Sequence, residues 1–247
     1  MPLAPAGLAV PLLLLAAWQA VTAAGWFSAS QLPPPGDVIA ALGDLLRRGE
    51  LWTHLQASLG RVSLGYLLGS AAALAIGSLV GLSLTARRLL APTVAALRTV
   101  PSLAWVPLLL LWFGIDETPK VLLVAIGAFF PVYTTTASAL SHVDPQLLEV
   151  GRAYGRDGAA LLTTVMLPAA APALLNGLRL GLANAWLFLV AAELIASSKG
   201  LGFLLIDSQN TGRTDVMLLA IGLLAALGKF SDAALGGLEK RMVIRRN

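Results

Sequence analysis

The sequence predicts an all-α integral membrane protein with six transmembrane helices. Of its 247 residues, 57% are hydrophobic and only 12% are charged, and the mean hydropathy is +0.79. Soluble domains carry about 25% charged residues, so this chain has too little polar surface to cover a water-soluble globular enzyme. The length fits about six spans of roughly 20 residues each, joined by short loops.

The lack of cysteine and the scarcity of histidine exclude several kinds of functional site. With no cysteine, the chain has no disulfide, Cys-ligated zinc, iron–sulfur cluster or thiol nucleophile. Its two histidines, His54 and His142, offer little for a metal site, and we expect none. The net charge of +4 is typical of cytoplasmic loops rich in Lys and Arg. No basic run is interleaved with aromatic residues, so nucleic acid is not expected as a partner.

Residues 1–50 are expected to form an N-terminal transmembrane helix followed by a helix on the membrane surface. Residues 7–27 are uncharged and long enough to cross a bilayer, and no basic residue precedes Arg47, so an uncleaved span is favoured over a signal peptide. Three consecutive prolines, Pro33–Pro35, end that helix. After them, apolar residues recur at helical spacing against charged ones up to Arg48, which predicts a short amphipathic helix.

The second, third and fourth spans are predicted over 62–86, about 99–113 and about 121–141. Small residues recur at every fourth position of the second span: Gly65, Gly69, Ala73, Gly77 and Gly81. Such a ridge permits the close approach of another helix. The fourth span contains Pro131, which a membrane helix tolerates when its neighbours satisfy the freed carbonyl.

Residues 142–172 are expected to form two short cytoplasmic helices joined at a glycine. Although 158–178 are uncharged, Pro168 and Pro172 interrupt that stretch, and polar residues precede it. Asp144 followed by Pro145 predicts the start of the first helix, Gly155 can end it in the left-handed conformation, and Asp157 can cap a second helix that ends near Pro168.

A polar helix pair between two hydrophobic spans cannot be buried in lipid without unsatisfied backbone groups and charges. We therefore place the 142–172 loop in the cytoplasm, where a soluble partner can reach it. An ordinary cytoplasmic loop is the alternative. The second helix favours a partner because it has an apolar face of its own, formed by Leu161, Leu162, Val165 and Met166.

The fifth and sixth spans are predicted over about 173–196 and 215–236, linked by the glycine-containing stretch 198–214. The fifth span repeats the ridge of small residues at Gly177, Gly181 and Ala185. The expected organisation is therefore an N-terminal region over 1–50, a transmembrane core over 51–240 that includes the 142–172 loop, and a basic cytoplasmic tail over 241–247.

The orientation follows from the basic residues of the loops. With the N-terminus inside, nine lie on the inner side: Arg87, Arg88, Arg98, Arg152, Arg156, Lys240, Arg241, Arg245 and Arg246. Five lie on the outer side: Arg47, Arg48, Lys120, Lys199 and Arg213. This bias predicts that both termini are cytoplasmic.

The 142–172 loop resembles the EAA loop of binding-protein-dependent ABC importer permeases. In that family a Glu, a Gly six residues later, an aliphatic residue and a Leu-Pro pair recur at the offsets found here: Glu149, Gly155, Val165, Leu167 and Pro168. The chain departs from the pattern at two alanines, where it has Val150 and Gly151. Gly151 is expected to weaken the first helix by about 1 kcal/mol relative to Ala without changing the role of the loop.

Other stretches resemble the nitrate, sulfonate and taurine branch of this family, most closely the aliphatic sulfonate permeases. They are LPPPGDVIAAL, ELWTHLQASLGRV, VPLLLLWFGIDETPKVLL, GAFFPVY, VAAELIASSKGLGFLL and GRTDVM. Together with the loop, they extend the likeness over nearly the whole chain.

The resemblance implies a type I importer fold and a division of labour in the bacterial cytoplasmic (inner) membrane. Two copies of the permease, a homodimer, would form the pathway. Two cytoplasmic ABC ATPase subunits would bind at the loops, and an extracytoplasmic solute-binding protein would deliver a small anionic or zwitterionic solute. Transport would proceed inward by alternating access.

ATP and Mg are then expected on the ATPase subunits, and this chain is not expected to be an enzyme or to bind a cofactor. Its nearest match to a phosphate-binding loop runs from Gly222 to Phe230. That stretch has five residues between its glycines instead of four, and Phe230 where Ser or Thr must hold magnesium.

The resemblance implies that the ATPase subunits contact Glu149, Gly151, Arg152, Ala153, Tyr154, Gly155, Leu167 and Pro168. The ridges predict helix packing at Gly65, Gly69, Gly77, Gly81, Gly177 and Gly181. Candidates for the translocation pathway are Asn184, Trp186, Glu193 and Trp105. Each of these four has a packing alternative, and Glu193 can instead pair with Lys199 or with another helix.

Two other function classes remain as alternatives. A secondary transporter or channel often has inverted repeats and intramembrane charges, but no convincing repeat is present and intramembrane acidic residues are sparse. An integral membrane enzyme is less favoured, because the chain has no Gly-x-Ser-x-Gly or His-Glu-x-x-His motif and no cysteine nucleophile. The sequence does not identify the solute.

Overall fold

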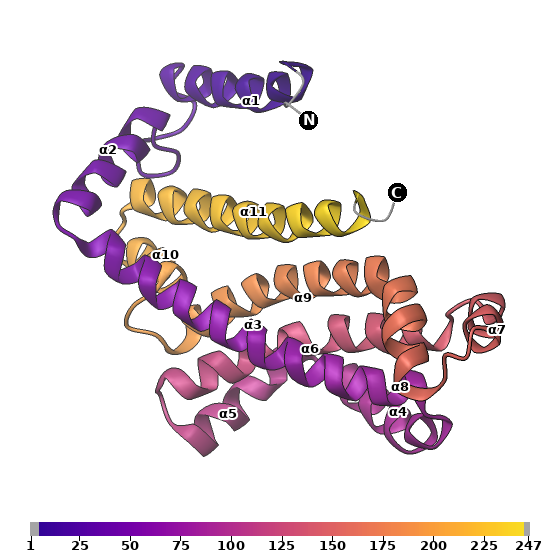
Figure 1. The fold of residues 1–247 in the computed structure, drawn as a ribbon. Helices are drawn as coiled ribbons and strands as arrows, with labels where there is room; N and C mark the ends of the chain where they lie inside the picture. The colour runs from indigo at the N-terminus through magenta and orange to yellow at the C-terminus, as the bar shows by residue number, and fades with distance from the viewer. Residues whose placement is uncertain (1–4, 245–247) are drawn as a thin grey trace. The chain divides into compact units, whose positions relative to one another are not determined.

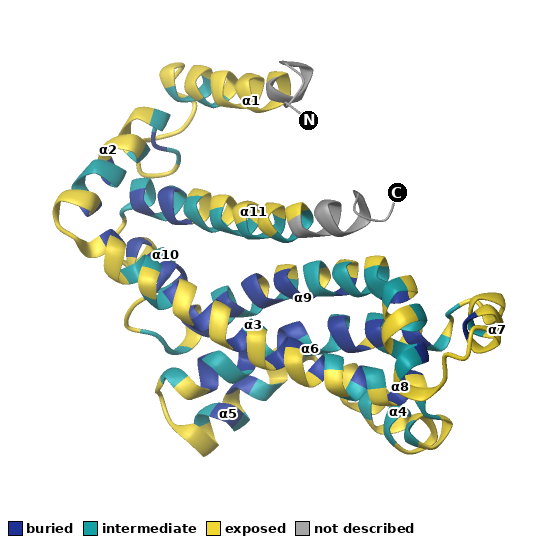
Figure 2. Cartoon of the chain, viewed as in Figure 1, coloured by how far each residue is buried: buried dark blue, intermediate teal, exposed yellow. Residues whose placement is uncertain are grey.

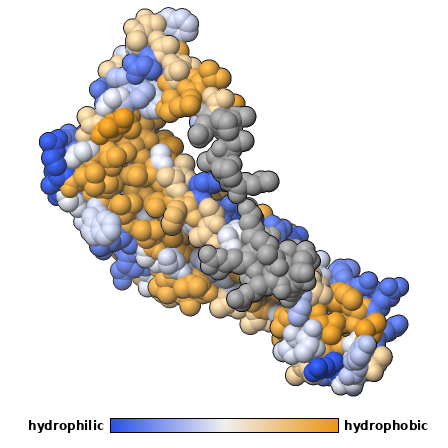
Figure 3. Space-filling model, turned by 45° about the horizontal axis from the view of Figure 1, so that its top comes forward, coloured by the Kyte–Doolittle hydropathy of each residue, from blue (hydrophilic) through white to orange (hydrophobic). Residues whose placement is uncertain are grey.

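The structure, a computed structural model, describes residues 5–244, with side-chain exposure for residues 9–101 and 103–237. Every regular element within these residues is helical (Figure 1). The predicted all-α class is therefore confirmed. Large apolar side chains such as Leu64, Leu67 and Leu111 are exposed, and hydrophobic residues cover broad areas of the surface (Figure 3). Such a surface suits a lipid environment better than water.

Four helices are long and apolar enough to cross a membrane: Glu50–Leu82, Glu117–Ser141, Gly158–Ala196 and Thr214–Gly237. A fifth candidate is the bent pair Leu84–Thr99 and Leu103–Phe113. The apolar segment of α1 (Pro5–Ala23) is shorter, Ala9–Ala23. By length and composition, the described residues thus give four or five spans, and the predicted six would also need α1.

The chain divides into two compact units, of which the first comprises residues up to Ser58 and 197–226. It contains α1, the amphipathic α2 (Pro35–Arg47), the first turns of α3 (Glu50–Leu82), α10 (Leu201–Asn210) and the beginning of α11 (Thr214–Ile244). The Leu201 backbone N–H donates to Ser58 Oγ at 2.8 Å. Helix α10 lies in the stretch 198–214, for which the sequence predicted only a link.

In the second unit, residues 59–196 and those from 227 onward, α6 (Glu117–Ser141) packs between α3 and α9 (Leu167–Ala196). A Cβ on Gly65 would lie 2.7 Å from the Val121 carbonyl oxygen, and one on Gly81 would lie 2.8 Å from Leu140 Cβ. Contacts therefore advance in the same direction along both chains, so α3 and α6 run parallel. The side of α6 between its neighbours is buried along most of its length (Figure 2).

Helix α9 runs antiparallel to α6. A Cβ on Gly177 would lie 2.7 Å from Thr135 Cβ, and one on Gly181 would lie 2.5 Å from Val132 Cγ2. The glycines of both ridges thus face α6, where any side chain would meet atoms already in contact. Close backbone approach of this kind is how membrane helices gain packing energy without a hydrophobic driving force between them.

The third span is not the continuous helix predicted over 99–113. Helix α4 (Leu84–Thr99) ends at Val100, which is extended with φ −69° and ψ 123°. A 3₁₀ turn (Ser102–Trp105) and α5 (Val106–Phe113) follow, and the bend between the two helices is 84°. Pro101 explains the break, because a proline disfavours helical geometry in the residue before it.

The prediction that a short helix ends near Pro168 is also wrong. After α7 (Pro145–Ala153), residues from α8 (Gly158–Leu161) continue through a π-helical turn (Leu162–Met166) into α9 as one helix of 39 residues. Figure 1 shows this helix turning sharply between α8 and the body of α9. The wide π turn and Pro172 lie near this bend, and both are known causes of kinks without termination.

Candidate functional site: the α7 surface and the ion pairs of the bundle

Helix α7 is bounded by local backbone chemistry at both ends. Asp144 Oδ1 accepts from the Gln146 backbone N–H at 2.9 Å. At the other end, the Arg156 N–H donates to the Gly151 carbonyl at 3.0 Å and the Gly155 N–H to the Arg152 carbonyl at 2.9 Å. With Gly155 at φ +71°, this is a Schellman end. Both capping residues are those that the sequence indicated.

Gly151 is the point at which α7 packs on the start of the long α8–α9 helix. A Cβ on Gly151 would lie 2.6 Å from Leu161 Cδ1 and 3.0 Å from Val165 Cγ2. Leu161 is buried and Val165 half-buried. The departure from alanine that the sequence interprets as a weakness of α7 thus permits a close contact, because a Cβ at this position would require the ends of the Leu161 and Val165 side chains to shift.

An apolar stripe on α7 is exposed. Leu147, Val150 and Tyr154 are 47, 55 and 81% exposed, and their spacing of three and four residues places them on one helix face. We call these three residues the α7 stripe. Clustered apolar side chains on a polar loop mark an interaction surface.

The other residues that the resemblance implies as ATPase contacts differ in how far they are buried. Exposed are Glu149, Arg152, Ala153, Gly155 and Leu167, and Pro168 is half-buried. Gly151 is buried under α8, so it supports the loop from inside. The structure thus separates a reachable face of α7 from an internal packing residue.

A buried ionic cluster joins α3, α6 and α9 at the end of α6 opposite α7. Arg61 donates twice to Glu117, from Nε to Oε2 at 2.6 Å and from Nη2 to Oε1 at 2.7 Å. Its Nη1 donates to Glu193 Oε1 at 2.8 Å. Lys120 Nζ lies 3.5 Å from Glu117 Oε1. We call these four residues the Arg61 cluster.

The Arg61 cluster contains two cations and two carboxylates, so its formal charge is zero. Arg61 is 3% exposed and Glu193 has no exposed surface. The geometry is the bidentate one that gives arginine–carboxylate pairs their strength. Sequence reasoning singled out Glu193 and its possible pairing with another helix, but missed Arg61 and Glu117. Both are ionisable and lie within about one turn of a predicted span boundary, and this pattern on two helices could have indicated an ion pair between them.

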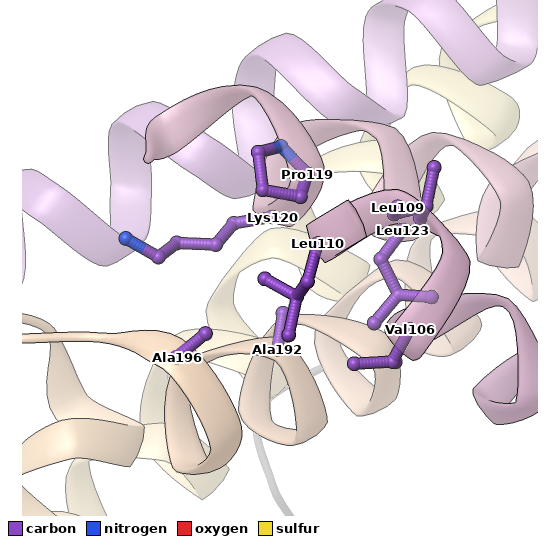
Figure 4. Close-up of a pocket in the computed structure, with 8 residues that line it drawn as sticks. All are labelled: Val106, Leu109, Leu110, Pro119, Lys120, Leu123, Ala192 and Ala196. Atoms are coloured by element: carbon purple, nitrogen blue, oxygen red, sulfur yellow. The ribbon is translucent and has the colours of Figure 1, made fainter. Parts of the chain in front are cut away.

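A small pocket of about 10 Å³ lies beside Lys120 between α5, α6 and α9. Figure 4 shows that its walls are apolar, among them Val106, Leu110 and Ala192, and that the Lys120 ammonium points away from them. A space of this size holds at most about one water molecule, so it is not a site for a solute.

The remaining pathway candidates have structural partners. Trp186 Nε1 donates to Ser231 Oγ at 2.9 Å, next to a bidentate pair between Arg179 and Asp232 at 2.9 and 3.0 Å. Asn184 Nδ2 donates to the Leu180 carbonyl of its own helix at 3.0 Å. Trp186 thus connects α9 to α11, and Asn184 bonds within α9, so these two side chains do not converge on one point.

Trp105 lines an apolar cavity of about 610 Å³ between α3, α4 and α6, together with residues such as Ala72, Ile126 and Phe129. The Trp105 Nε1–H is buried and has no hydrogen-bond partner in the described part of the chain. The structure therefore does not bring the four pathway candidates together.

Comparisons with known proteins agree on one family. Residues 65–244 match the sequence profile of the family described as "Binding-protein-dependent transport system inner membrane component". A Bacillus subtilis (strain 168) protein named as an aliphatic sulfonates transport permease, SsuC, is 42% identical over 98% of this chain and 87% of its own. The taurine transport system permease protein TauC of Escherichia coli (strain K12) is 36% identical over 93% of this chain and 85% of its own.

Two further matches extend the comparison. The nitrate import permease protein NrtB of Leptolyngbya laminosa is 32% identical over 79% of this chain and 70% of its own. Among solved structures, a chain of the MetNI methionine ABC transporter in inward-facing conformations superposes with a TM-score of 0.66 at 21% identity. It covers 78% of this chain and 97% of its own. At that identity the likeness shows the fold alone.

Proposed function

The chain belongs to the family of binding-protein-dependent transport system inner membrane components and is a permease subunit of an ABC importer, and on that basis we propose that it imports a small sulfonate-class solute. The observation that carries the proposal is the 42% identity, over 98% of the chain, to a permease named for aliphatic sulfonates. Relatives named for taurine and nitrate fit the same class, because all three solutes carry an oxyanion group.

The proposed assembly has a second copy of this chain, two ABC ATPase subunits that bind ATP and Mg, and an extracytoplasmic solute-binding protein. In it the chain is a multi-pass inner-membrane protein with both termini in the cytoplasm. A closed two-fold arrangement would present two α7 stripes, one for each ATPase subunit. The chemistry of ATP belongs to those subunits, and this chain contributes the pathway.

The α7 stripe is the proposed docking surface for the ATPase subunit. It offers two aliphatic side chains and one tyrosine, a residue type enriched at the energetic centres of interfaces. The charged Glu149 and Arg152, both exposed on the same short helix, would form a polar rim around it.

The long α8–α9 helix supplies the mechanical link. Because Gly151 packs α7 directly on Leu161 and Val165, a displacement of α7 is passed to the first turn of a helix that runs without a break to Ala196. ATP-driven closure of the ATPase subunits would in this way tilt α9. Alternating access follows if that tilt opens one end of the pathway while it closes the other.

Reconstitution tests this proposal. The permease is co-purified with its ATPase subunits, placed in liposomes with the solute-binding protein, and supplied with radiolabelled butanesulfonate. We expect uptake that requires ATP and stops when the ATPase subunits carry a substitution of the P-loop lysine. Uptake driven by an ion gradient without ATP would instead favour a secondary transporter and contradict the proposal.

A further inference from the structure

A largely apolar pocket with basic residues at its wall lies between the end of α3, α4 and the second half of α6, apart from the α7 stripe and from the Arg61 cluster. Its volume is about 340 Å³, within the usual range for small-molecule sites. Three of its lining residues carry or can carry positive charge, Arg87, Arg98 and His142, and none is acidic. The lining therefore favours an anion.

Arg98 lies beside α6, one of the helices that are long and apolar enough to cross a membrane. It donates from Nη1 to Thr134 Oγ1 at 3.3 Å. Thr134 is seven residues from the end of α6 at Ser141, which places it about 10 Å inside the helix end at 1.5 Å per residue. An ionisable group within a span normally faces protein or a water-filled cavity and marks a functional site.

The Arg98 guanidinium is available to a ligand. It is exposed and has no carboxylate partner in the described part of the chain. Arg87, in contrast, is held at the end of α3 by the carbonyls of Val80 and Gly81, at 3.4 and 3.3 Å. The two arginines are eleven residues apart on α4, about 16 Å along the helix axis, so one small anion can bind only one of them.

Polar and apolar groups flank Arg98 in a pattern that suits an amphiphilic ligand. Ser138 follows Thr134 by four residues, so both hydroxyls lie on one face of α6, and both line the pocket. Ala91, Val94 and Ala137 form an apolar wall of the same pocket. The Ser138 hydroxyl can donate to an oxyanion while the wall contacts carbon atoms. The Thr134 hydroxyl donates to the Phe130 carbonyl at 2.9 Å and accepts from Arg98, so it holds the guanidinium in place.

A second pocket on the other side of α6 provides a contrast. It shares Thr134, Ser138 and His142 with the first pocket, but Asp144 lines it and no lysine or arginine does. The polar stripe of α6 therefore meets a cation only on the α4 side.

We propose that the pocket between α4 and α6 binds an oxyanion group carried on a short aliphatic body, with Arg98 and Ser138 holding the oxygen atoms and Thr134 positioning the Arg98 guanidinium. The arginine supplies charge-assisted hydrogen bonds, and the Ser138 hydroxyl adds a further donor to the oxyanion head. Two ligands have this chemistry, an imported alkanesulfonate and the headgroup of an anionic phospholipid. The assignment to an alkanesulfonate rests on the function proposed above, since it makes the pocket a binding site for the imported solute.

Direct binding to the intact permease–ATPase complex tests the site without transport. The complex is placed in nanodiscs of phosphatidylcholine, and radiolabelled butanesulfonate is titrated in the absence of the solute-binding protein. We expect Arg98→Gln to weaken binding roughly tenfold or more and Arg98→Lys to weaken it less. The matched control is Arg88→Gln, because Arg88 lies on the same helix and does not line the pocket. It should change binding less than twofold.

A second experiment, on bound lipid, distinguishes the alkanesulfonate from the phospholipid headgroup. The complex is purified from membranes that contain phosphatidylglycerol, and native mass spectrometry counts the phosphatidylglycerol molecules retained. Loss of retained lipid in Arg98→Gln, with unchanged butanesulfonate binding, would assign the site to a headgroup. Loss of butanesulfonate binding alone would assign it to the cargo.

If the complex with Arg98→Gln fails to assemble, Thr134→Val provides a second test of the site. It removes the hydroxyl that accepts from the Arg98 guanidinium and preserves the shape of the side chain, and we expect it to weaken whichever ligand binds severalfold. Unchanged binding of both ligands in the two variants would overturn the site, even if ATP-driven uptake is normal. Absence of ATP-driven uptake in the unmodified complex would instead overturn the proposed function.

Discussion

At the scale of single residues, the structure shows that a charge in a membrane helix is informative only with its partners. Glu193 stood out in the sequence as an acidic residue near the end of a span, but its environment depended on Arg61, 132 positions earlier. Taking charges out of water costs several kcal/mol each, and the bidentate geometry with Glu117 offsets that cost. The Arg61 cluster is therefore expected to be intolerant of the loss of one member.

We predict that Arg61→Ala lowers the free energy of unfolding by about 3–5 kcal/mol, since it leaves the fully buried Glu193 carboxylate without its guanidinium. Denaturation of the purified permease in detergent measures the effect. The control is Arg47→Ala, because the pair of Arg47 with Asp44 is 80% and 44% exposed and such surface pairs contribute little. Equal stability of the two variants would contradict a role for the cluster in holding the three helices.

Glycines of α3 offer a second comparison at this scale. Gly69→Ala would place a Cβ against the backbone of Ala125 on α6, whereas Gly60→Ala meets nothing within 4 Å. We predict a loss of about 1–3 kcal/mol for Gly69→Ala, as for other overpacked positions. Gly60→Ala should be neutral or slightly stabilising, because Ala favours a helix over Gly. Thermal unfolding of both variants in the same detergent decides, and an equally tolerated Gly69→Ala would refute close packing there.

At the scale of elements, the ends of α7 could be predicted from their capping residues, whereas the points at which helices bend were not predicted. Asp144, Pro145 and Gly155 fix both ends of α7 through bonds within a few residues, so their pattern could be interpreted directly. The bend after Val100 has a local cause in Pro101, which a hydropathy pattern does not register, whereas the continuation through Pro168 follows from the π turn before it. Hydropathy reports the cost of transfer into lipid, not whether a helix turns, and so the third span was predicted to be straight.

The α7 stripe carries a prediction about assembly. Tyr154→Ser should leave the fold intact, since the side chain is 81% exposed, but reduce co-purification of the ATPase subunits roughly tenfold or more, as for an aromatic residue at the centre of an interface. Thr163→Ser serves as the control, because Thr163 is also exposed on this side of the chain and its hydroxyl bonds only its own helix. Full co-purification with Tyr154→Ser would exclude the stripe as the docking surface.

At the scale of the whole molecule, composition alone predicted a membrane protein, and the resemblance of the loop predicted the family. The family is shown by the comparisons, and the all-helical fold by the structure. The pocket at Arg98 could not be predicted, because the sequence gives no reason to bring α4 against α6. The sequence assigned its arginines to the inner side of the membrane, and the structure adds that Arg98 is hydrogen-bonded to Thr134 of α6.

Orientation is testable because the chain contains no cysteine. A single cysteine introduced as Tyr154→Cys, in permease expressed without its ATPase subunits, should react with a membrane-impermeant maleimide in inside-out vesicles and not in intact cells, since nine basic residues are predicted on that side. Asn210→Cys, at the end of α10, should react in intact cells. The opposite pattern at the two positions would reverse the assigned topology and remove α7 from the reach of a cytoplasmic partner.

The placement of α6 between two glycine ridges has a mechanical consequence. Because α3 and α9 both touch α6 at backbone level and the Arg61 cluster ties their ends, a force applied to one of the three helices is shared by all of them. They should therefore move as one stiff block. The flexing of an import cycle would then fall to the bend at Val100–Pro101, outside that block, and restraining the chain there should stall transport while leaving the bundle intact.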